Sequence, residues 1–358
     1  MNMGGQETFI MNVYRNIDRS KVQFDFLINV KEKSDYEDEI ISLGGIIHRI
    51  PRRFPNYFQH LQHANDFFKS NKRYKIVHQH TNSLTAISTA ICAKKAEVSK
   101  IIYHCHSSKA DKGVIGRLFN FYYKPQIKKY ITHYFACSEK AAKNLFGTHV
   151  SEKEIRIIPN AIEIEKFVYD YKKREQKRKQ LEVENKFVVG HVGRFTEAKN
   201  HAFLIEIFEQ IYSQNKNAIL LLVGDGKLRD SIEEKVNAKG LRDNVIFAGL
   251  QADISEFLCA MDVFLFPSLW EGLGIALIEA QTSGLHCIAS DAIPKETKVT
   301  ELIEYVSLGD YARFWAERAL EYGDNYKREN MRSEIMKAGY DIKETAMQLQ
   351  NFYLENQF

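Results

Sequence analysis

The chain lacks any run of roughly 18 or more apolar residues along its 358 positions. Because a helix needs about that length to span the hydrocarbon core of a bilayer, no transmembrane helix is expected. No signal peptide is visible at the start either. The five cysteines are odd in number and mostly lie in apolar segments, which indicates buried free thiols in a reducing compartment. We therefore expect a cytoplasmic protein.

Several motifs with a strong chemical meaning are also absent. No Gly-x-Gly-x-x-Gly turn with a downstream acidic residue occurs, which argues against hydride transfer with a dinucleotide. No Cys-x2-Cys pair or His-Glu-x-x-His helix accompanies the histidine pairs His78/His80 and His104/His106, so a zinc site is not expected. No nucleic-acid recognition motif appears, and nucleic acid is not an expected partner.

The composition is that of a folded globular protein, with 44% hydrophobic and 12% aromatic residues. The length predicts two domains rather than one core. Charge is uneven, because residues 1–165 hold 25 Lys and Arg against 16 Asp and Glu, whereas the remainder holds 25 against 30. The basic first half suggests an anionic partner such as a membrane surface, and a mixed solvated surface is the alternative.

Apolar strand patterns alternate with helical patterns in both halves of the chain. This alternation predicts βαβ units and parallel sheets. A stretch dense in charged residues, 169–184, separates the two series, and we see no chemistry in it. The predicted strands are residues 24–28, 46–50, 76–80, 101–106 and 134–138 in the first half and 187–193, 218–223, 245–249, 263–266 and 286–290 in the second.

We expect two Rossmann-like, doubly wound domains, residues 1–165 and 166–310, followed by C-terminal helices over residues 311–358. The first domain has an anomaly at its start, where a glycine turn at Gly4 and Gly5 already leads into a helix. A Rossmann-like domain needs a strand before that turn. We therefore expect either that the given start lies too late or that the domain lacks its first, central strand, and the second case would expose sheet edges.

The most informative segment is FPSLWEGLGIALIEAQTSG, residues 266–284. A buried strand ends at Pro267, a loop holds Glu271 and two glycines, and a helix that carries Glu279 begins at Ile275. Open α/β sheets bind ligands at this end of their strands. Glycines and a helix N-terminus favour an anion, and carboxylates accept hydrogen bonds from hydroxyl groups. A nucleotide-sugar has both an anionic diphosphate and hydroxyl groups.

Two cations lie in a similar position after the strand at 187–193. Arg194 and Lys199 are five residues apart at a strand's C-terminal end, where they would clamp a diphosphate, and Gly193 permits close backbone approach. Two unrelated surface cations are the alternative.

The Glu-x7-Glu segment resembles the motif of retaining glycosyltransferases of the GT-B fold, family 4. Two further segments, VGRFTEAKN at 192–200 and LLVGDG at 221–226, are similar to the family's phosphate-binding and scaffold segments. The resemblance implies two Rossmann-like domains that face each other across a cleft, with a C-terminal helix that crosses back to the first domain. It also implies a metal-independent hexosyl- or N-acetylhexosaminyl-transferase without a cofactor. The donor would be a nucleotide-diphosphate sugar, with UDP expected, and the acceptor a saccharide, lipid-linked, in extracellular or capsular polysaccharide synthesis.

The resemblance also assigns roles to individual residues. Glu279 would accept from the ribose hydroxyls, Glu271 would contact sugar hydroxyls, and His106 would contact the donor sugar. His80 would line the acceptor side. The expected catalytic group is Glu271, His106, Arg194 and Lys199, and the expected donor-binding group is Gly4, Gly5, Gly193, Arg194, Lys199, Glu271, Gly272, Leu273, Gly274 and Glu279.

Two other functions remain open on the sequence. A GT-B nucleotide-sugar epimerase or hydrolase would use the same glutamates and a histidine. A non-catalytic partner in polysaccharide assembly would accommodate the missing first strand.

The first half contains a segment in which cations and aromatic residues are interleaved, which suits the inner face of the cytoplasmic membrane. The alternative is that these aromatic residues fill the core while the cations are solvated. The segment comprises Arg49, Arg52, Arg53, Lys69, Lys72, Arg73 and Lys75 with Phe54, Tyr57, Phe58, Phe67 and Phe68.

Overall fold

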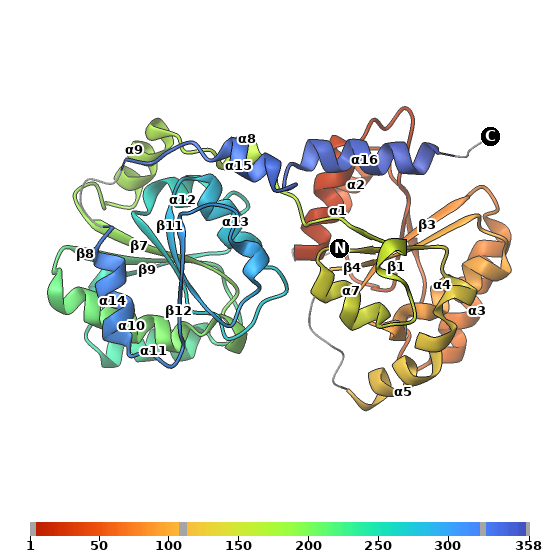
Figure 1. The fold of residues 1–358 in the computed structure, drawn as a ribbon, viewed down its shortest axis with the longest axis horizontal. Coiled ribbons are helices and arrows are strands. Elements are labelled where there is room, and N and C mark those ends of the chain that lie inside the picture. Colours follow the sequence, from red (N-terminus) through yellow and green to blue (C-terminus); the bar gives the residue numbers. More distant parts are fainter. Residues whose placement is uncertain (1–4, 107–112, 323–326, 356–358) are drawn as a thin grey trace. The chain divides into compact units, whose positions relative to one another are not determined.

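The computed structural model describes residues 5–106, 113–322 and 327–355 (Figure 1). The chain divides into two compact units, the first formed by Met1–Ile162 and Gly339–Phe358 and the second by Glu163–Ala338. Both are α/β structures with parallel strands. Among the described residues, every helix is too short or too polar to cross a bilayer. All five cysteines are buried, and no disulfide joins them.

The second unit is built on a six-stranded sheet in the order β12-β11-β10-β7-β8-β9, with every pairing parallel. Its strands are continuous apolar runs because both faces are covered by helices. β8, for example, reads Ala-Ile-Leu-Leu-Leu-Val and is buried throughout. The strands are β7 Phe187–Val192, β8 Ala218–Val223, β9 Val245–Gly249, β10 Val263–Phe266, β11 His286–Ser290 and β12 Ile303–Val306.

The helices of the second unit cover the two faces of this sheet (Figure 1). The long helix α10 buries Leu204, Ile207, Phe208 and Ile211 at helical spacing against one face, where Trp315 of α14 is also fully buried. The helices are α8 Ile164–Phe167, α9 Tyr171–Gln180, α10 His201–Gln214, α11 Arg229–Ala238, α12 Ser255–Ala260, α13 Ile275–Thr282, α14 Ala312–Leu320 and α15 Arg332–Lys337.

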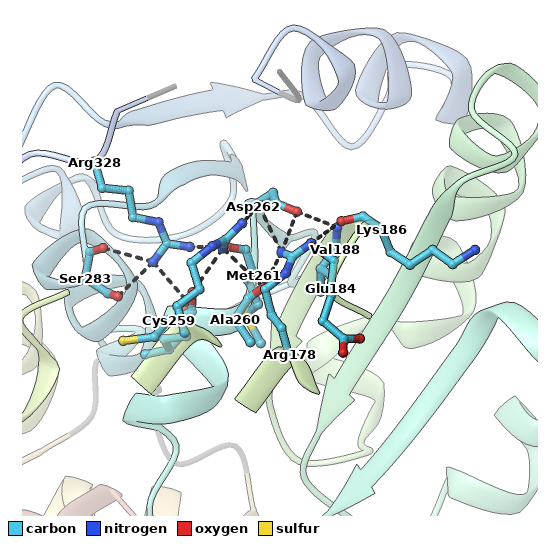
Figure 2. Close-up of polar contacts among 12 residues, drawn as sticks. Arg178, Glu184, Lys186, Val188, Cys259, Ala260, Met261, Asp262, Ser283 and Arg328 are labelled. Carbon is cyan, nitrogen blue, oxygen red and sulfur yellow. Dashed lines mark hydrogen bonds and ion pairs between the residues drawn. The ribbon is translucent and has the colours of Figure 1, made fainter. Parts of the chain in front are cut away.

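A network of largely shielded guanidinium groups holds α9 to the rest of the second unit (Figure 2). Arg174 and Arg178 both pair with Asp262, at 2.5 and 3.1 Å, and Arg178 also donates to the carbonyl of Ala260 at 2.9 Å. The Asp262 carboxylate in turn accepts from the backbone N–H of Val188 at 2.7 Å. Because Asp262 precedes β10 and Val188 lies in β7, the network fixes these two strands at their N-terminal ends.

Arg328 adds a third guanidinium to the same region (Figure 2). It donates to the carbonyl oxygens of Leu258, Met261 and Ser283, which include carbonyls at the end of α12 that lack helical partners. The charged stretch 169–184, in which the sequence indicated no chemistry, therefore has a structural role in the second unit through Arg174 and Arg178.

The first unit holds two separate parallel sheets, β1-β2 and β3-β4-β5-β6. β1 and β3 both line a cavity of about 600 Å³. No strand precedes α1 among the described residues. The strands are β1 Phe26–Ile28, β2 Ile47–Arg49, β3 Ile76–Thr81, β4 Lys100–Cys105, β5 His133–Ala136 and β6 Ile155–Ile157. The helices are α1 Gly5–Asn16, α2 Glu37–Ser42, α3 Tyr57–Ser70, α4 Ile87–Lys95, α5 Val114–Tyr123, α6 Ile127–Tyr130, α7 Glu139–Phe146 and α16 Ile342–Leu354.

The three tail helices are divided between the units. α14 and α15 pack in the second unit, whereas α16 packs against α1 in the first. Tyr353 of α16 contacts the His78 ring, with its hydroxyl 2.6 Å from Nδ1, and Lys100 donates to the carbonyl of Phe352 at 2.7 Å. The sequence analysis had grouped residues 311–358 together and placed the first boundary at residue 165. In the structure the first boundary follows Ile162, and the tail is divided before Gly339.

The basic and aromatic residues of the first unit differ in their exposure and in their partners. Phe68 is 3% exposed and Phe67 packs against the same core cluster, so the prediction that these two rings face a membrane is wrong. They lie on the inward face of α3. Arg49 and Arg73 are paired with the carboxylates of Glu37 and Asp25. Phe54 and Phe58 remain exposed.

Candidate active site

The loops after β7 and β10 lie side by side at the carboxyl edge of the six-stranded sheet. The two strands are hydrogen-bonded neighbours, with Val263 opposite Val189, and the Leu269 N–H donates to the carbonyl of Ala198 at 2.8 Å. The chain runs outward from β7 through β8 to β9 and then returns to β10 on the other side of β7. Parallel sheets bind ligands at such a reversal of strand order.

Lys199 and Glu271 meet across these two loops. Lys199 Nζ is 2.7 Å from Glu271 Oε1, and both side chains are largely shielded from water, at 17% and 12% exposure. The ammonium group also lies 4.4 Å from the centroid of the Phe266 ring. The sequence predicted that both residues belong to one site, and the structure brings them together as an ion pair.

The backbone around Gly193 is packed too closely for a side chain. A Cβ at Gly193 would lie 2.8 Å from His191 Nε2, and a Cβ at Gly224 would lie 2.2 Å from the Gly193 carbonyl oxygen. Gly224 also has a φ of +133°, which L side chains rarely adopt. Arg194 follows on the surface of the loop, where its exposed side chain can reach an anion.

The loop after β10 ends at the N-terminus of α13. Gly274 has a left-handed backbone, with φ of +85°, and serves as the N-cap, while Leu273 is buried and anchors the turn. This conformation favours glycine. The first N–H groups of α13, as at the start of any α-helix, have no carbonyl of a preceding turn to bond. Gly272 lies between Leu273 and the paired Glu271. The loop therefore combines backbone donors with a carboxylate, as the sequence predicts.

Glu279 lies on α13 and is only partly exposed. Burial raises the pKa of its carboxyl to about 8, although the nearby charges of Lys166 and Lys199 act in the opposite direction. A protonated carboxyl at neutral pH has one O–H donor besides its acceptor oxygens, and it can therefore both donate to and accept from a pair of hydroxyl groups.

Three aromatic rings that the sequence analysis missed pack beneath the loop after β7, which carries Arg194 and Lys199. Phe195 is fully buried and stacks on His201 with ring centroids 4.0 Å apart, and His201 contacts His191 edge-on at 4.8 Å. Burial lowers the pKa of His201 to about 4, so the ring is neutral at physiological pH. The only signal in the sequence was an aromatic residue directly after Arg194 and a histidine directly after the loop.

The first unit contains the other candidate residues, His80 and His106. Their rings are linked at 2.7 Å, and His106 Nδ1 is 2.8 Å from Asn160 Oδ1. With the Asn160 oxygen as acceptor, His106 donates from Nδ1 and accepts at Nε2 from His80 Nδ1–H, so His80 Nε2 carries a lone pair. Burial lowers the pKa of His106 to about 4. Both rings are hydrogen-bonding groups in their neutral form.

His78 and His104 belong to the same histidine cluster. His78 Nε2 is 3.2 Å from His104 Nδ1, and nitrogens of His78, His80 and His104 lie within 4.8 Å of one another. The structure thus gathers histidines from two strands, β3 and β4, which the sequence pairs alone did not establish. Within the cluster each ring already has an imidazole neighbour as a hydrogen-bond partner.

The N-terminal glycines were expected to lie over the diphosphate. Gly4 is outside the described residues, and Gly5 is the first residue of α1, where a Cβ would meet no atom within 4 Å. The role predicted for these two glycines stays a prediction.

Comparison with known families identifies both parts of the chain. Residues 3–166 match the family model described as Glycosyltransferase Family 4, and residues 172–301 match Glycosyl transferases group 1. The chain is 35% identical over 362 residues to the putative glycosyltransferase EpsF of Bacillus subtilis (strain 168), and the match covers 99% of this chain and 94% of EpsF.

Two further comparisons extend this result. An Escherichia coli UDP-Gal:alpha-D-GlcNAc-diphosphoundecaprenol alpha-1,3-galactosyltransferase is 27% identical over 305 residues, which cover 79% of this chain and 76% of that enzyme. The crystal structure of Anabaena Alr3699/HepE in complex with UDP superposes with a TM-score of 0.79 at 19% identity, covering 98% of this chain and 96% of HepE. The expected α/β, GT-B fold class is confirmed.

Proposed function

The chain belongs to the group 1, family 4 glycosyltransferases, and on that premise we propose that it transfers a sugar from UDP to a saccharide acceptor with retention of anomeric configuration. The observation that carries the proposal is the Lys199–Glu271 ion pair at the reversal of strand order between β7 and β10. A cation beside a carboxylate at this edge of the sheet supports the proposal, because a nucleotide-sugar carries its anionic diphosphate next to the hydroxyl groups of its sugar.

The donor is assigned to UDP-sugars because the E. coli relative is named for UDP-Gal and HepE was crystallised with UDP. Arg194 and Lys199 bind the diphosphate, and Glu279 hydrogen-bonds the ribose hydroxyls. When the diphosphate takes Lys199 as its partner, Glu271 becomes available for the sugar hydroxyls. Gly193, Gly272 and Gly274 let the backbone of the two loops approach the phosphates, because glycine has no side chain in the way.

The reaction needs no covalent enzyme intermediate in this account. The bond between the anomeric carbon and the phosphate oxygen breaks, and the acceptor hydroxyl oxygen bonds to that carbon on the same face. The acceptor proton passes to the departing phosphate. Arg194 and Lys199 stabilise the negative charge that develops on UDP, which is the largest contribution the site can offer and the basis for proposing metal independence.

The histidines of the first unit are assigned to sugar binding rather than to acid catalysis. The low pKa of His106, about 4, leaves the ring neutral at physiological pH. Following the family resemblance, His106 contacts the donor sugar and His80 the acceptor. A lone pair at His80 Nε2 suits a hydrogen bond from an acceptor hydroxyl.

The acceptor is proposed to be a lipid-linked saccharide in the assembly of a surface polysaccharide. The E. coli relative is named for a diphosphoundecaprenol-linked acceptor. A basic first half, with 25 Lys and Arg against 16 Asp and Glu over residues 1–165, suits an anionic membrane surface on which such an acceptor is presented. The enzyme would then act on the inner face of the cytoplasmic membrane.

The test is incubation of the purified protein with a panel of UDP- and GDP-sugars and lipid-linked or short saccharide acceptors, followed by NMR of the product. We expect transfer from a UDP-sugar and an anomeric configuration equal to that of the donor. An inverted product would contradict the mechanism. Isomerisation of the donor without acceptor would favour an epimerase instead.

A further inference from the structure

Helix α5 is apolar on two sides, but its packing in the first unit uses only one of them. Its inward side consists of Gly116, the one buried residue of the helix, together with Phe119 and Tyr123, which pack against a core cluster of the first unit. A surface helix normally presents polar residues on the opposite side.

The outward side of α5 is apolar instead. Its side chains recur at positions i, i+1, i+4, i+7 and i+8, which is the spacing of one continuous helical face. Aliphatic and aromatic residues exposed to this extent on a ten-residue helix indicate a surface that another structure covers. They are Val114, Ile115, Leu118, Phe121 and Tyr122, with 74%, 50%, 63%, 84% and 59% of their surface exposed.

Two phenylalanines extend this surface beyond α5. Phe54 is 41% exposed and lies edge-on to Phe119 of α5, with ring centroids 6.4 Å apart. Phe58 of α3 is 84% exposed and contacts Tyr57, which itself lies 6.0 Å from Phe119. We call the seven exposed residues Phe54, Phe58, Val114, Ile115, Leu118, Phe121 and Tyr122 the α5 surface.

Exposed basic side chains lie on α5 itself and on α6, the next α-helix of the chain. Arg117 lies on α5 and Lys128 and Lys129 on α6, and all three are exposed. Lys128 is paired with Glu154 at 2.6 Å, and residues 1–165 as a whole carry an excess of nine positive charges, 25 minus 16. In a symmetric dimer, two copies would bring these cations close to one another, which is unfavourable. Anionic headgroups, by contrast, attract them.

We propose that the α5 surface inserts into the interfacial region of an anionic lipid bilayer, with α5 lying along the membrane plane. Exposed apolar and aromatic side chains enter the boundary between headgroups and acyl chains, and the flanking cations contact the headgroups. The inference rests on the proposed function only in taking a lipid surface as the place where the acceptor is found. The surface assigned here differs from the one predicted from sequence, because Phe67 and Phe68 are core residues and α5 supplies most of the apolar area.

The test uses the full chain and sedimentation with vesicles of phosphatidylcholine alone or mixed with phosphatidylglycerol. The variant Leu118→Glu/Phe121→Glu places two carboxylates on the outward face of α5, where both side chains are exposed and the fold should be unaffected. The matched control, Tyr311→Glu/Phe314→Glu, changes two exposed aromatic residues of the second unit, at 87% and 45% exposure. Circular dichroism and the melting temperature show whether each variant is folded.

We expect the wild type and the control to bind the mixed vesicles and the α5 variant to lose at least tenfold in partition coefficient. A Phe121→Trp variant should show a blue-shifted emission on adding mixed vesicles. Equal binding by the wild type and the α5 variant would overturn the proposal. So would wild-type binding to both vesicle types that salt does not affect, or a wild-type dimer that the α5 variant abolishes without any vesicle binding.

A separate measurement distinguishes this proposal from the proposed function. Calorimetric binding of UDP in the absence of vesicles depends on the second unit's loops and not on α5. If the wild type does not bind vesicles but binds UDP normally, the proposal for the α5 surface is refuted and the donor site is not. Vesicle binding without UDP binding would refute the donor site and leave the α5 surface standing.

Discussion

Lys199 and Glu271 form an ion pair between two loops that follow neighbouring strands, with 2.7 Å between Nζ and Oε1. The pairing means that one cation of the proposed diphosphate clamp is already neutralised before a donor binds. A diphosphate must compete with Glu271 for Lys199, and the sugar then gains a carboxylate that has lost its cation. The ion pair thus couples donor binding to the availability of Glu271.

The first prediction concerns the variant Glu271→Gln. Without the carboxylate, Lys199 is free to bind a diphosphate, so the affinity for UDP alone should rise, by about twofold to tenfold. Transfer should fall at least tenfold in kcat/KM, because a neutral amide is a weaker acceptor for the sugar hydroxyls. Calorimetry with UDP and steady-state kinetics with a UDP-sugar measure the two effects. If both quantities fall together, the competition described here is wrong.

The second prediction concerns Glu279, whose pKa is raised to about 8 by burial. The ordinary pKa is 4.5, so between pH 4.5 and 8 the folded protein keeps a proton that the unfolded chain releases. The free energy of unfolding should therefore fall as pH rises through this window. Urea denaturation at pH 5 and pH 8 should show a decline that is smaller in Glu279→Gln, by more than about 1 kcal/mol.

The matched control for that measurement is Glu301→Gln, because the Glu301 side chain is 93% exposed. It should keep the pH dependence of the wild type. A Glu279→Gln variant whose stability declines with pH as steeply as that of the wild type would show that Glu279 is ionised at neutral pH in the folded protein.

The third prediction concerns Asp262, the shared acceptor for Arg174 and Arg178. Asp262→Ala leaves two shielded guanidinium groups without their counter-ion and should lower the free energy of unfolding by about 3–5 kcal/mol. Asp38→Ala is the control, because Asp38 pairs with Lys33 at an exposed position, at 78% and 66% exposure, and should change stability by at most about 1 kcal/mol. Equal effects of the two substitutions in urea denaturation would show that the network does not hold α9.

The fourth prediction concerns the histidine pair of the first unit. Because Asn160 Oδ1 accepts from His106, both His106 and His80 should carry their proton on Nδ1, and Nε2 of each ring should be unprotonated. Nitrogen-15 spectra of the imidazole rings at pH 6 report the tautomer directly. Asn160→Leu should remove the preference in His106. A wild-type spectrum with either ring protonated at Nε2 would reverse the order of the hydrogen bonds.

The sequence predicted that four candidate residues of the second unit lie at one edge of the sheet, because the carboxyl ends of parallel strands meet there. Glu271 and Gly274 follow β10, and Arg194 and Lys199 follow β7, so all four had to lie at that edge. The contact between Lys199 and Glu271 could not be predicted from these local patterns alone. It depends on β7 and β10 being neighbours, and strand order is a long-range property that local patterns do not contain.

The arginine network, the inward face of α3 and the exposure of α5 could not be predicted from the sequence, each for its own physical reason. Arg174 and Arg178 lie in a run of charges that is typical of a solvated helix, and their partner Asp262 is remote in sequence. Phe67 and Phe68 alternate with cations, but the pattern does not reveal which face of α3 meets the core. In α5, a helix with apolar residues on two sides resembles a buried helix until its exposure is known.

The most direct test of the donor site is the kinetics of Arg194→Ala and Lys199→Ala with a UDP-sugar, alongside the surface control Lys216→Ala. Each of the first two variants should lose at least tenfold in kcat/KM, which corresponds to about 1.4 kcal/mol of transition-state stabilisation, while the control keeps wild-type values. Wild-type kinetics in a folded Arg194→Ala or Lys199→Ala variant would contradict the assignment of the diphosphate to this edge of the sheet.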